Sequence, residues 1–309
     1  MADKLVLITG ATGHLGFRVL RSALEAGYHV RAAVRSDQKA TTLKSNNVLK
    51  NTPGFSNLSF VVVPDFLAPG AFDEAAKNVK YIIHVASPIV TKLPEGDDFD
   101  AHFVKPAVQG TLGVFESAKK ASTVIRIVVT SSAVAILPLN ALAQSDGQTY
   151  SADNRLPEIE PPFANGRVGY VASKIAALNR AEAWIAEEKP SFDVIHIHPS
   201  YIFGRDDLAD STEYFQTGTN RMPLNIALGE ISDPQPNTWN DVHDTAKMHV
   251  LALNPKVPGN QSFLASSTGQ DGMKYVVAPQ EQHNLHANAN VDSDLIRSRT
   301  LLLATSPKL

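Results

Sequence analysis

A strand-like run followed by three evenly spaced glycines, close to the start of the chain, constrains the fold most. Residues 5–8 read Leu-Val-Leu-Ile, which is typical of a strand buried on both faces. Glycines follow at positions 10, 13 and 16, and an apolar periodic run then leads to Gly27, the expected C-cap of a helix. This order of strand, glycine turn and helix N-terminus suits a pyrophosphate and therefore predicts dinucleotide binding.

Each glycine of the turn has an expected role. Gly10 permits the tight turn, Gly13 keeps a side chain out of the anion's path, and Gly16 lets helix and strand pack closely. The alternative is an ordinary turn in an α/β protein. The residues that we expect to contact a coenzyme here are Gly10, Thr12, Gly13, His14, Leu15 and Gly16.

Length, charge and cysteine content exclude several classes of protein. The 309 residues are 43% apolar and carry a formal charge of −3, so neither a nucleic acid nor a membrane surface is an expected partner. The absence of cysteine excludes disulfides, thiolate metal sites and a cysteine nucleophile. No leader precedes the first strand and no apolar run is long enough to span a bilayer, so we expect a cytoplasmic protein. Either a monomer or a homodimer fits these observations.

Strand-like and helix-like runs alternate along the first 200 residues. The expected strands are 5–9, 28–34, 58–63, 79–86, 124–130 and 192–198, and the expected helices include 71–78, 103–120 and 171–188. This alternation predicts an α/β fold, a Rossmann-type doubly wound parallel sheet. We assign residues 1–200, with returning segments near 238–268, to an NADP-binding core, and residues 201–309 mainly to a small C-terminal substrate-binding lobe.

Two irregular regions, 135–168 and 204–240, are long enough to suggest function. They are expected to build a substrate pocket over the carboxyl ends of the strands. Beyond residue 268 the pattern weakens into a polar stretch, Gln280 to Asn290, followed by a short helical pattern at Ser293–Ala304. A loosely packed tail is an equal alternative there.

The end of the second strand indicates which coenzyme is bound. The strand ends in Arg35 and contains no acidic residue, and Lys39 follows nearby. A guanidinium matches a 2′-phosphate, so this end favours NADP(H) over NAD(H), although Asp37 weakens the argument. Solvated surface cations are the alternative.

Three further strand ends carry candidate coenzyme contacts. Asp65 and Phe66 close the third strand and suit adenine, unless Asp65 simply initiates a turn. The small residues Ala86 and Ser87 follow the fourth strand and leave room for a cofactor, whereas His84 within that strand is interpreted as structural. Pro199 ends the sixth strand, where it would shape a nicotinamide pocket.

Tyr170 and Lys174 form the sharpest signal. They are four residues apart, so both side chains project from one face of a helix, and no other tyrosine has a lysine at this spacing. Such a lysine favours the phenolate and lowers the pKa of the tyrosine, which makes Tyr170 a candidate general acid or base. A contact on a helix surface is the alternative.

Hydroxyls also gather where the fifth strand ends, at Thr130, Ser131 and Ser132. One of them could donate a hydrogen bond to a substrate oxygen, or cap a helix. His196 and His198 share a face of the sixth strand, but no third ligand accompanies them at a metal-site spacing, so we expect no metal.

In combination these motifs resemble the extended short-chain dehydrogenase/reductase family, over about residues 4 to 255. The resemblance is closest to its dihydroflavonol reductase-like branch, which includes fungal and yeast NADPH-dependent aldehyde, ketone and methylglyoxal reductases. It rests on Thr9-Gly10-x-x-Gly13-x-x-Gly16, Thr130-Ser131-Ser132, Tyr170-x-x-x-Lys174, Val30-Arg31-Ala32-x-Val34-Arg35-x-x-x-Lys39, His84-x-Ala86-Ser87-Pro88, Pro106-Ala107-Val108-x-Gly110-Thr111 and Asp241-Val242-x-Asp244-x-Ala246.

The resemblance implies roles for individual residues. Ser132, Tyr170 and Lys174 would be the catalytic set, Lys174 would also bridge the ribose hydroxyls, Arg35 and Lys39 would hold the 2′-phosphate, and Asp65 would meet adenine. The sequence thus predicts an NADPH-dependent carbonyl reductase acting on a small-molecule aldehyde or ketone. The alternatives are an NAD(P)-dependent sugar-nucleotide epimerase or dehydratase, and a non-catalytic NADP-sensing regulator.

Overall fold

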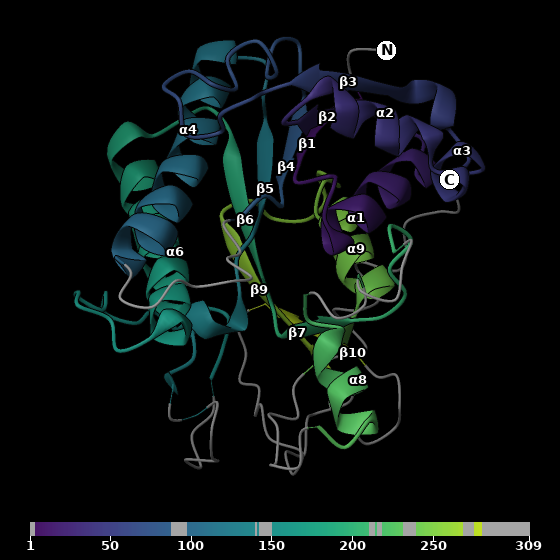
Figure 1. Cartoon of the computed structure of the whole chain (residues 1–309). Helices are drawn as coiled ribbons and strands as arrows, with labels where there is room; N and C mark the ends of the chain where they lie inside the picture. The colour runs from purple at the N-terminus through teal and green to yellow at the C-terminus, as the bar shows by residue number, and fades with distance from the viewer. Residues whose placement is uncertain are drawn as a thin grey trace.

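The computed structural model describes residues 4–87, 98–139, 141, 150–209, 214, 218–230, 239–267 and 275–279. Its centre is a sheet with the strand order β10-β9-β6-β5-β4-β1-β2-β3 (Figure 1). All neighbouring strands are parallel except β10, which runs antiparallel to β9. The strands are β1 (Leu5–Thr9), β2 (His29–Val34), β3 (Leu58–Val62), β4 (Tyr81–His84), β5 (Arg126–Thr130), β6 (Asp193–Pro199), β9 (Gln261–Ser267) and β10 (Tyr275–Pro279).

This order confirms the predicted doubly wound α/β fold. The strand order reverses between β1 and β4, and in such sheets the crevice for a ligand opens at the carboxyl ends of the strands on either side of that point. Each of the six predicted runs overlaps a strand to within two residues at either end. Consecutive residues of β1 face opposite sides: Val6 and Ile8 pack in one core and Leu7 in the other.

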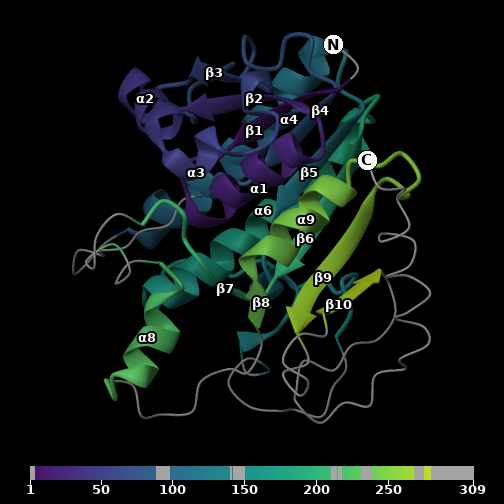
Figure 2. The same ribbon diagram turned by 90° about the vertical axis from the view of Figure 1, so that its right-hand side faces the viewer.

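Helices cover both faces of the sheet (Figures 1 and 2). On one face α1 (His14–Glu25) packs against α9 (Val242–Leu251), with α2 (Asp37–Ser45) and α3 (Asn47–Lys50) beside them. On the other face α4 (Lys105–Ala121) packs against α6 (Gly166–Glu188). Phe115 of α4 and Trp184 of α6 fill the core there. Among the described residues, no helix combines the length and the apolar character that crossing a bilayer requires.

The three predicted helices each need correction. Residues 71–78 do not form a helix but a series of turns, which ends at Asn78 with a positive φ of 60°. The segment is too short to be stable as an isolated helix, and its Asp73 instead bonds to Ser117 and Lys120 of α4. The predicted helix 103–120 begins with a π-helical segment, Asp100–Val104, and the predicted helix 171–188 begins five residues earlier than expected, at Gly166.

Gly27 follows α1, but it is the residue after the C-cap and not the predicted C-cap itself. Ala26 is the C-cap and Gly27 follows it with φ +79°. The amides of Gly27 and Tyr28 donate to the carbonyls of Leu24 and Ala23, which satisfies two carbonyls at the helix end. A glycine is needed here because its backbone is left-handed.

A second, two-stranded sheet lies beyond the carboxyl end of the main sheet. It pairs β7 (Tyr201–Phe203) with β8 (Trp239–Asp241) in parallel. The rings of Tyr201, Phe203 and Trp239 stack in succession along it. Helix α8 (Arg221–Ala227) extends away from the core (Figure 2). Strand β10 was not predicted, and the expected helix at Ser293–Ala304 lies outside the described residues.

Candidate active site

The glycine turn has the geometry that its sequence predicted. Gly10 has φ +76°, and a Cβ atom there would lie 2.6 Å from the amide nitrogen of Ala86. A Cβ on Gly16 would lie 2.0 Å from the carbonyl oxygen of Gly10, so the helix and the turn approach too closely for any side chain. Gly13 is the N-cap of α1 and has an extended backbone. The turn therefore presents the bare backbone and first amides of α1 at the crevice.

The remaining residues of the turn differ in exposure. Thr12 is exposed, whereas Leu15 is buried against the core beneath the turn. His14 is the first residue of α1 and half-buried, and its Nε2 is buried without a hydrogen-bond partner. Their contacts with a coenzyme stay a prediction.

Arg35 and Phe66 are brought together from different strand ends. Arg35 directly follows β2, and its guanidinium lies 5.8 Å from the centre of the Phe66 ring beyond β3. Lys39 lies in the first turn of α2, and both cations are exposed and form no ion pair with any described residue. Asp65 accepts a hydrogen bond at 2.9 Å from the Leu67 amide, so it does initiate a turn; its contact with adenine stays a prediction.

Helix α6 brings Tyr170 to the end of β5. The side chain of Asn165 caps α6 by accepting from the Val168 amide at 3.0 Å. Tyr170 follows in the second turn, and its hydroxyl forms a hydrogen bond with the side chain of Ser132. Ser132 also begins a short helical turn, Ala133–Ala135. The structure thus joins two of the three predicted catalytic residues.

The sequence predicted that Lys174 lowers the pKa of Tyr170, but in the structure that pKa is raised. Burial is the largest influence and raises the pKa of Tyr170, the hydrogen bond with Ser132 lowers it, and the nearby Tyr201 raises it again. The Lys174 Nζ atom lies 5.8 Å from the centre of the Tyr170 ring, so the predicted one-turn pairing is present. The phenol is therefore held in its protonated form at neutral pH.

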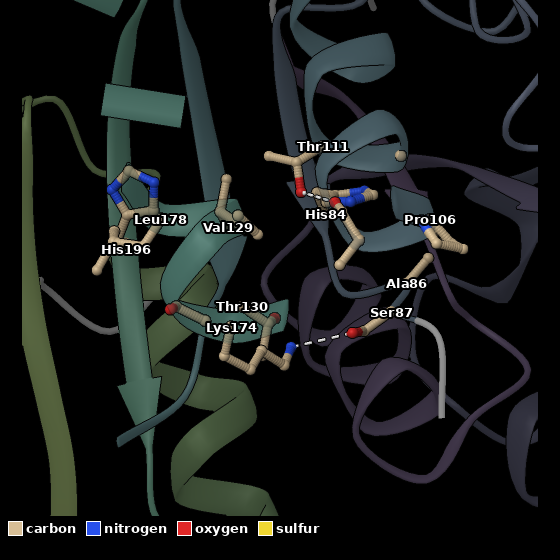
Figure 3. A pocket seen from close by; sticks show the side chains of 14 residues that line it. His84, Ala86, Ser87, Pro106, Thr111, Val129, Thr130, Lys174, Leu178 and His196 are labelled. Carbon is tan, nitrogen blue, oxygen red and sulfur yellow. Dashed lines mark hydrogen bonds between the residues drawn. The ribbon is translucent and has the colours of Figure 1, made fainter. Parts of the chain in front are cut away.

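Lys174 is itself 7% exposed, and burial lowers its pKa to about 8. Its Nζ atom donates a hydrogen bond to the Ser87 hydroxyl at 3.0 Å (Figure 3). Ser87 and Ala86 lie just after β4, as the sequence predicted, beside the glycine turn. Tyr170, Lys174, Ser132 and Ser87 therefore converge at the carboxyl ends of β4 and β5.

Thr130 has a structural partner that the sequence did not reveal. Its hydroxyl lies 2.8 Å from Nε2 of His249 in α9, while Nδ1 of that ring lies 2.7 Å from the Thr245 carbonyl. The carbonyl can only accept, so Nδ1 carries the hydrogen and the Thr130 hydroxyl donates to Nε2. The single donor of the Thr130 hydroxyl is therefore already used, and its contact with a coenzyme stays a prediction.

Three histidines of the sheet, His84, His196 and His198, are buried. His84 forms a 2.8 Å hydrogen bond with the Thr9 hydroxyl, and burial lowers its pKa to about 4. Burial also lowers the pKa of His196 to about 4 and that of His198 well below 6.5. His198 bonds to Ser262 at 3.2 Å. Among the described residues, no group of three potential ligands could hold a metal ion.

A small polar cavity adjoins Lys174 between the sheet, α4 and α6 (Figure 3). Its volume of about 30 Å³ suits one or two water molecules and is too small for a nicotinamide ring. The lining includes four buried polar side chains besides Lys174: His84, Thr111, Ser131 and His196.

Tyr201 is the residue near the site that sequence reasoning missed. It affects the pKa of Tyr170, and it starts the aromatic stack of the small sheet. The sequence could have indicated Tyr201 by its position, because it lies two residues after Pro199, which ends β6. Pro199 is buried at that strand end, and its contact with a nicotinamide stays a prediction.

The profile of the NAD dependent epimerase/dehydratase family matches residues 6–263. The chain belongs to this family, the extended short-chain dehydrogenases/reductases that its motifs resemble, and it is an oxidoreductase of that type. It is 47% identical over 282 residues to the ketoreductase CTB6 of Cercospora beticola, covering 89% of this chain and 78% of that protein. It is 36% identical over 266 residues to the NAD-dependent epimerase/dehydratase ALT6 of Alternaria alternata, covering 81% and 73%.

Solved structures with the same fold include two reductases with their coenzyme. The yeast methylglyoxal/isovaleraldehyde reductase Gre2 complexed with NADPH is 25% identical, with a TM-score of 0.71 over 85% of this chain and 80% of that one. Gre2 of Candida albicans in complex with NADPH is 29% identical, with a TM-score of 0.72 over 85% and 78%. The predicted fold and family are therefore confirmed.

Proposed function

We propose that the protein is an NADPH-dependent carbonyl reductase that converts an aldehyde or ketone to an alcohol. The observation that carries the proposal is the hydrogen bond between Tyr170 and Ser132, with Lys174 one helical turn further along α6. The similarity to CTB6, named a ketoreductase, and to the NADPH complexes of Gre2 supports it.

The residues of the crevice fit a dinucleotide. Side chains at Gly10 and Gly16 would clash with the backbone of Ala86 and of Gly10 itself, so glycine lets the turn bring the first amides of α1 to the crevice, where they suit a pyrophosphate. Arg35 and Lys39 supply two exposed cations without acidic partners among the described residues, which suits a 2′-phosphate. The proposed coenzyme contacts are Gly10, Thr12, Gly13, His14, Leu15, Gly16, Arg35, Lys39, Asp65, Phe66, Ala86, Ser87, Thr130, Tyr170, Lys174 and Pro199.

Three side chains take part in the proposed mechanism. The bound coenzyme supplies the hydride for the carbonyl carbon. Tyr170 donates its phenolic proton to the substrate oxygen, and its raised pKa keeps that proton in place until the oxygen gains negative charge. Ser132 would hold the substrate oxygen by a hydrogen bond, and the Lys174 ammonium would bind the coenzyme ribose.

A small-molecule carbonyl compound bound over the carboxyl ends of the strands completes the proposal. The lobe formed by residues beyond 200 would cover it, because β7 and β8 lie at that end of the sheet. The stacked rings of Tyr201, Phe203 and Trp239 give the lobe an apolar surface.

The test measures NADPH oxidation by the purified protein with aldehydes, diketones, flavonoids and ketoacids. We expect one NADPH consumed for each carbonyl group reduced. Product formation without net consumption of NADPH would instead indicate an epimerase or dehydratase. NADPH binding without turnover on any of these substrates would indicate a coenzyme-sensing regulator.

A further inference from the structure

We propose that Ser87 is a positioning residue for Lys174: its hydroxyl holds the ammonium at the crevice so that the ammonium can bind the coenzyme ribose. The inference rests on the proposed function, because it assigns a task to Lys174. Ser87 was predicted from the sequence only as a contact of the coenzyme itself.

The geometry carries this proposal. Ser87 lies three residues beyond β4, and Lys174 lies in the third turn of α6, so the 3.0 Å hydrogen bond joins two elements remote in sequence. The side chains of both residues point toward one another, and both residues line the small cavity (Figure 3). An ammonium has three N–H donors. One donor fixed on Ser87 leaves two for the ribose hydroxyls.

Within the described part of the chain, no carboxylate holds the Lys174 ammonium together with Ser87. Lys174 forms no ion pair there, and burial lowers its pKa. The titratable groups around it are His84 on β4, His196 and His198 on β6, and Tyr170 on its own helix. Burial lowers the pKa of each of these histidines, so they are neutral above about pH 6 and cannot stabilise the ammonium.

Ser87 therefore affects the protonation of Lys174. A hydrogen-bond acceptor favours the charged form of an ammonium, so loss of the hydroxyl lowers the pKa of Lys174 further below 10.5. The cavity has room for a water molecule that would partly replace the hydroxyl. We therefore expect a shift of about one pH unit rather than a larger one.

The experiment measures the Kd of NADPH by fluorescence titration between about pH 6 and 9. In the unaltered protein we expect binding to weaken above about pH 8, where Lys174 loses its proton. In Ser87→Ala the same weakening should begin about one pH unit lower. In Ser87→Thr, which keeps a hydroxyl, the midpoint should return toward that of the unaltered protein.

Thr111→Val is the matched control. Thr111 lines the same cavity, but its hydroxyl donates to the Ala107 carbonyl of its own helix rather than meeting Lys174. This variant removes a buried hydroxyl from the same cavity and should leave the pH midpoint of NADPH binding unchanged. Melting temperatures of all variants show whether each is folded.

The outcomes separate this inference from the proposed function. If Ser87→Ala binds NADPH with the same pH midpoint as the unaltered protein, Ser87 does not position Lys174, although the enzyme remains a reductase. An equal shift in Thr111→Val would also contradict the inference, because any change in the cavity would then suffice. If the unaltered protein neither binds NADPH nor consumes it, the proposed function itself is wrong.

Discussion

Two buried cations, one at each end of the strands of the main sheet, differ in how many hydrogen bonds they form. We call the amino-terminal ends of the strands the amino edge of the sheet and the carboxyl-terminal ends the carboxyl edge. At the amino edge Arg126, 6% exposed, uses all five of its N–H donors. Two donors bind the carboxylate of Asp193, at 2.6 and 2.9 Å, and three bind carbonyls between α9 and β9. At the carboxyl edge Lys174, almost equally buried, has among the described residues one acceptor, Ser87, for its three donors.

Other groups at the carboxyl edge are also incompletely bonded. Nε2 of His14, at the start of α1, and the hydroxyl of Ser200, just beyond β6, are buried without a hydrogen-bond partner among the described residues. A buried polar group without a hydrogen bond is destabilising, so such groups persist mainly where they serve function. We therefore infer that the amino edge stabilises the fold and that the carboxyl edge carries the chemistry. Substitutions at the amino edge should lower the free energy of unfolding, and substitutions at the carboxyl edge should lower kcat.

The largest effect is expected at the carboxyl edge. Tyr170→Phe removes the proton donor and should lower kcat by about 10²–10⁴-fold. The Kd of NADPH and the melting temperature should change little, because the ring and its edge contact with Phe103 remain. Steady-state kinetics, NADPH titration and thermal unfolding together check this.

Ser173→Ala is a suitable control for that variant. Ser173 is buried in the same helix, and its hydroxyl donates to the Tyr170 carbonyl rather than to the phenol. It should keep kcat within a few-fold. A normal rate in Tyr170→Phe would show that another group donates the proton and would remove the main argument for chemistry at this edge.

The next effect is expected at the amino edge. Arg126→Met leaves Asp193 without its cation and three carbonyls without donors, so the free energy of unfolding should fall by about 3–4 kcal/mol. The kcat measured at low temperature should be retained. Urea denaturation measures the first quantity and steady-state kinetics the second.

Arg180→Met provides the contrast for Arg126→Met. Arg180 also binds a carboxylate through two donors, at 2.8 and 3.0 Å to Glu158, but its side chain is 61% exposed. Its loss should cost at most about 1 kcal/mol. Equal destabilisation by the two variants would mean that burial is not what gives the amino edge its stability.

These edges also differ in how far the sequence predicts them. Local signals sufficed for the glycine turn, because the left-handed backbone of Gly10 and the close approach of the backbone at Gly16 both require glycine. They sufficed for Tyr170 and Lys174, because helical spacing places both on one face. A run of apolar residues likewise located β1 and β5.

The contacts that complete the site were beyond local reasoning. Ser87 meets Lys174 across 87 positions, and Thr130 meets His249 across 119. Such contacts depend on how strands are ordered and on which helix lies over which strand end. The predicted helix at 71–78 was wrong for the same reason. The segment forms turns, and its Asp73 forms a hydrogen bond with α4, a contact that the local pattern cannot predict. Raised pKa values such as that of Tyr170 follow from burial, which spacing alone cannot reveal.

The smallest predicted effect concerns Arg35, at the exposed end of the crevice. Arg35→Leu removes the cation proposed for the 2′-phosphate, so the Kd of NADPH should rise about 10-fold while that of NADH stays the same. Because Arg35 is exposed, added salt should shrink the preference of the unaltered protein for NADPH. Lys44→Leu is the control: Lys44 also lies over a phenylalanine ring, 5.2 Å from the centre of Phe60, but in the last turn of α2. An equal loss of NADPH affinity in both variants would mean that the general positive charge of this surface, and not Arg35, selects the phosphate.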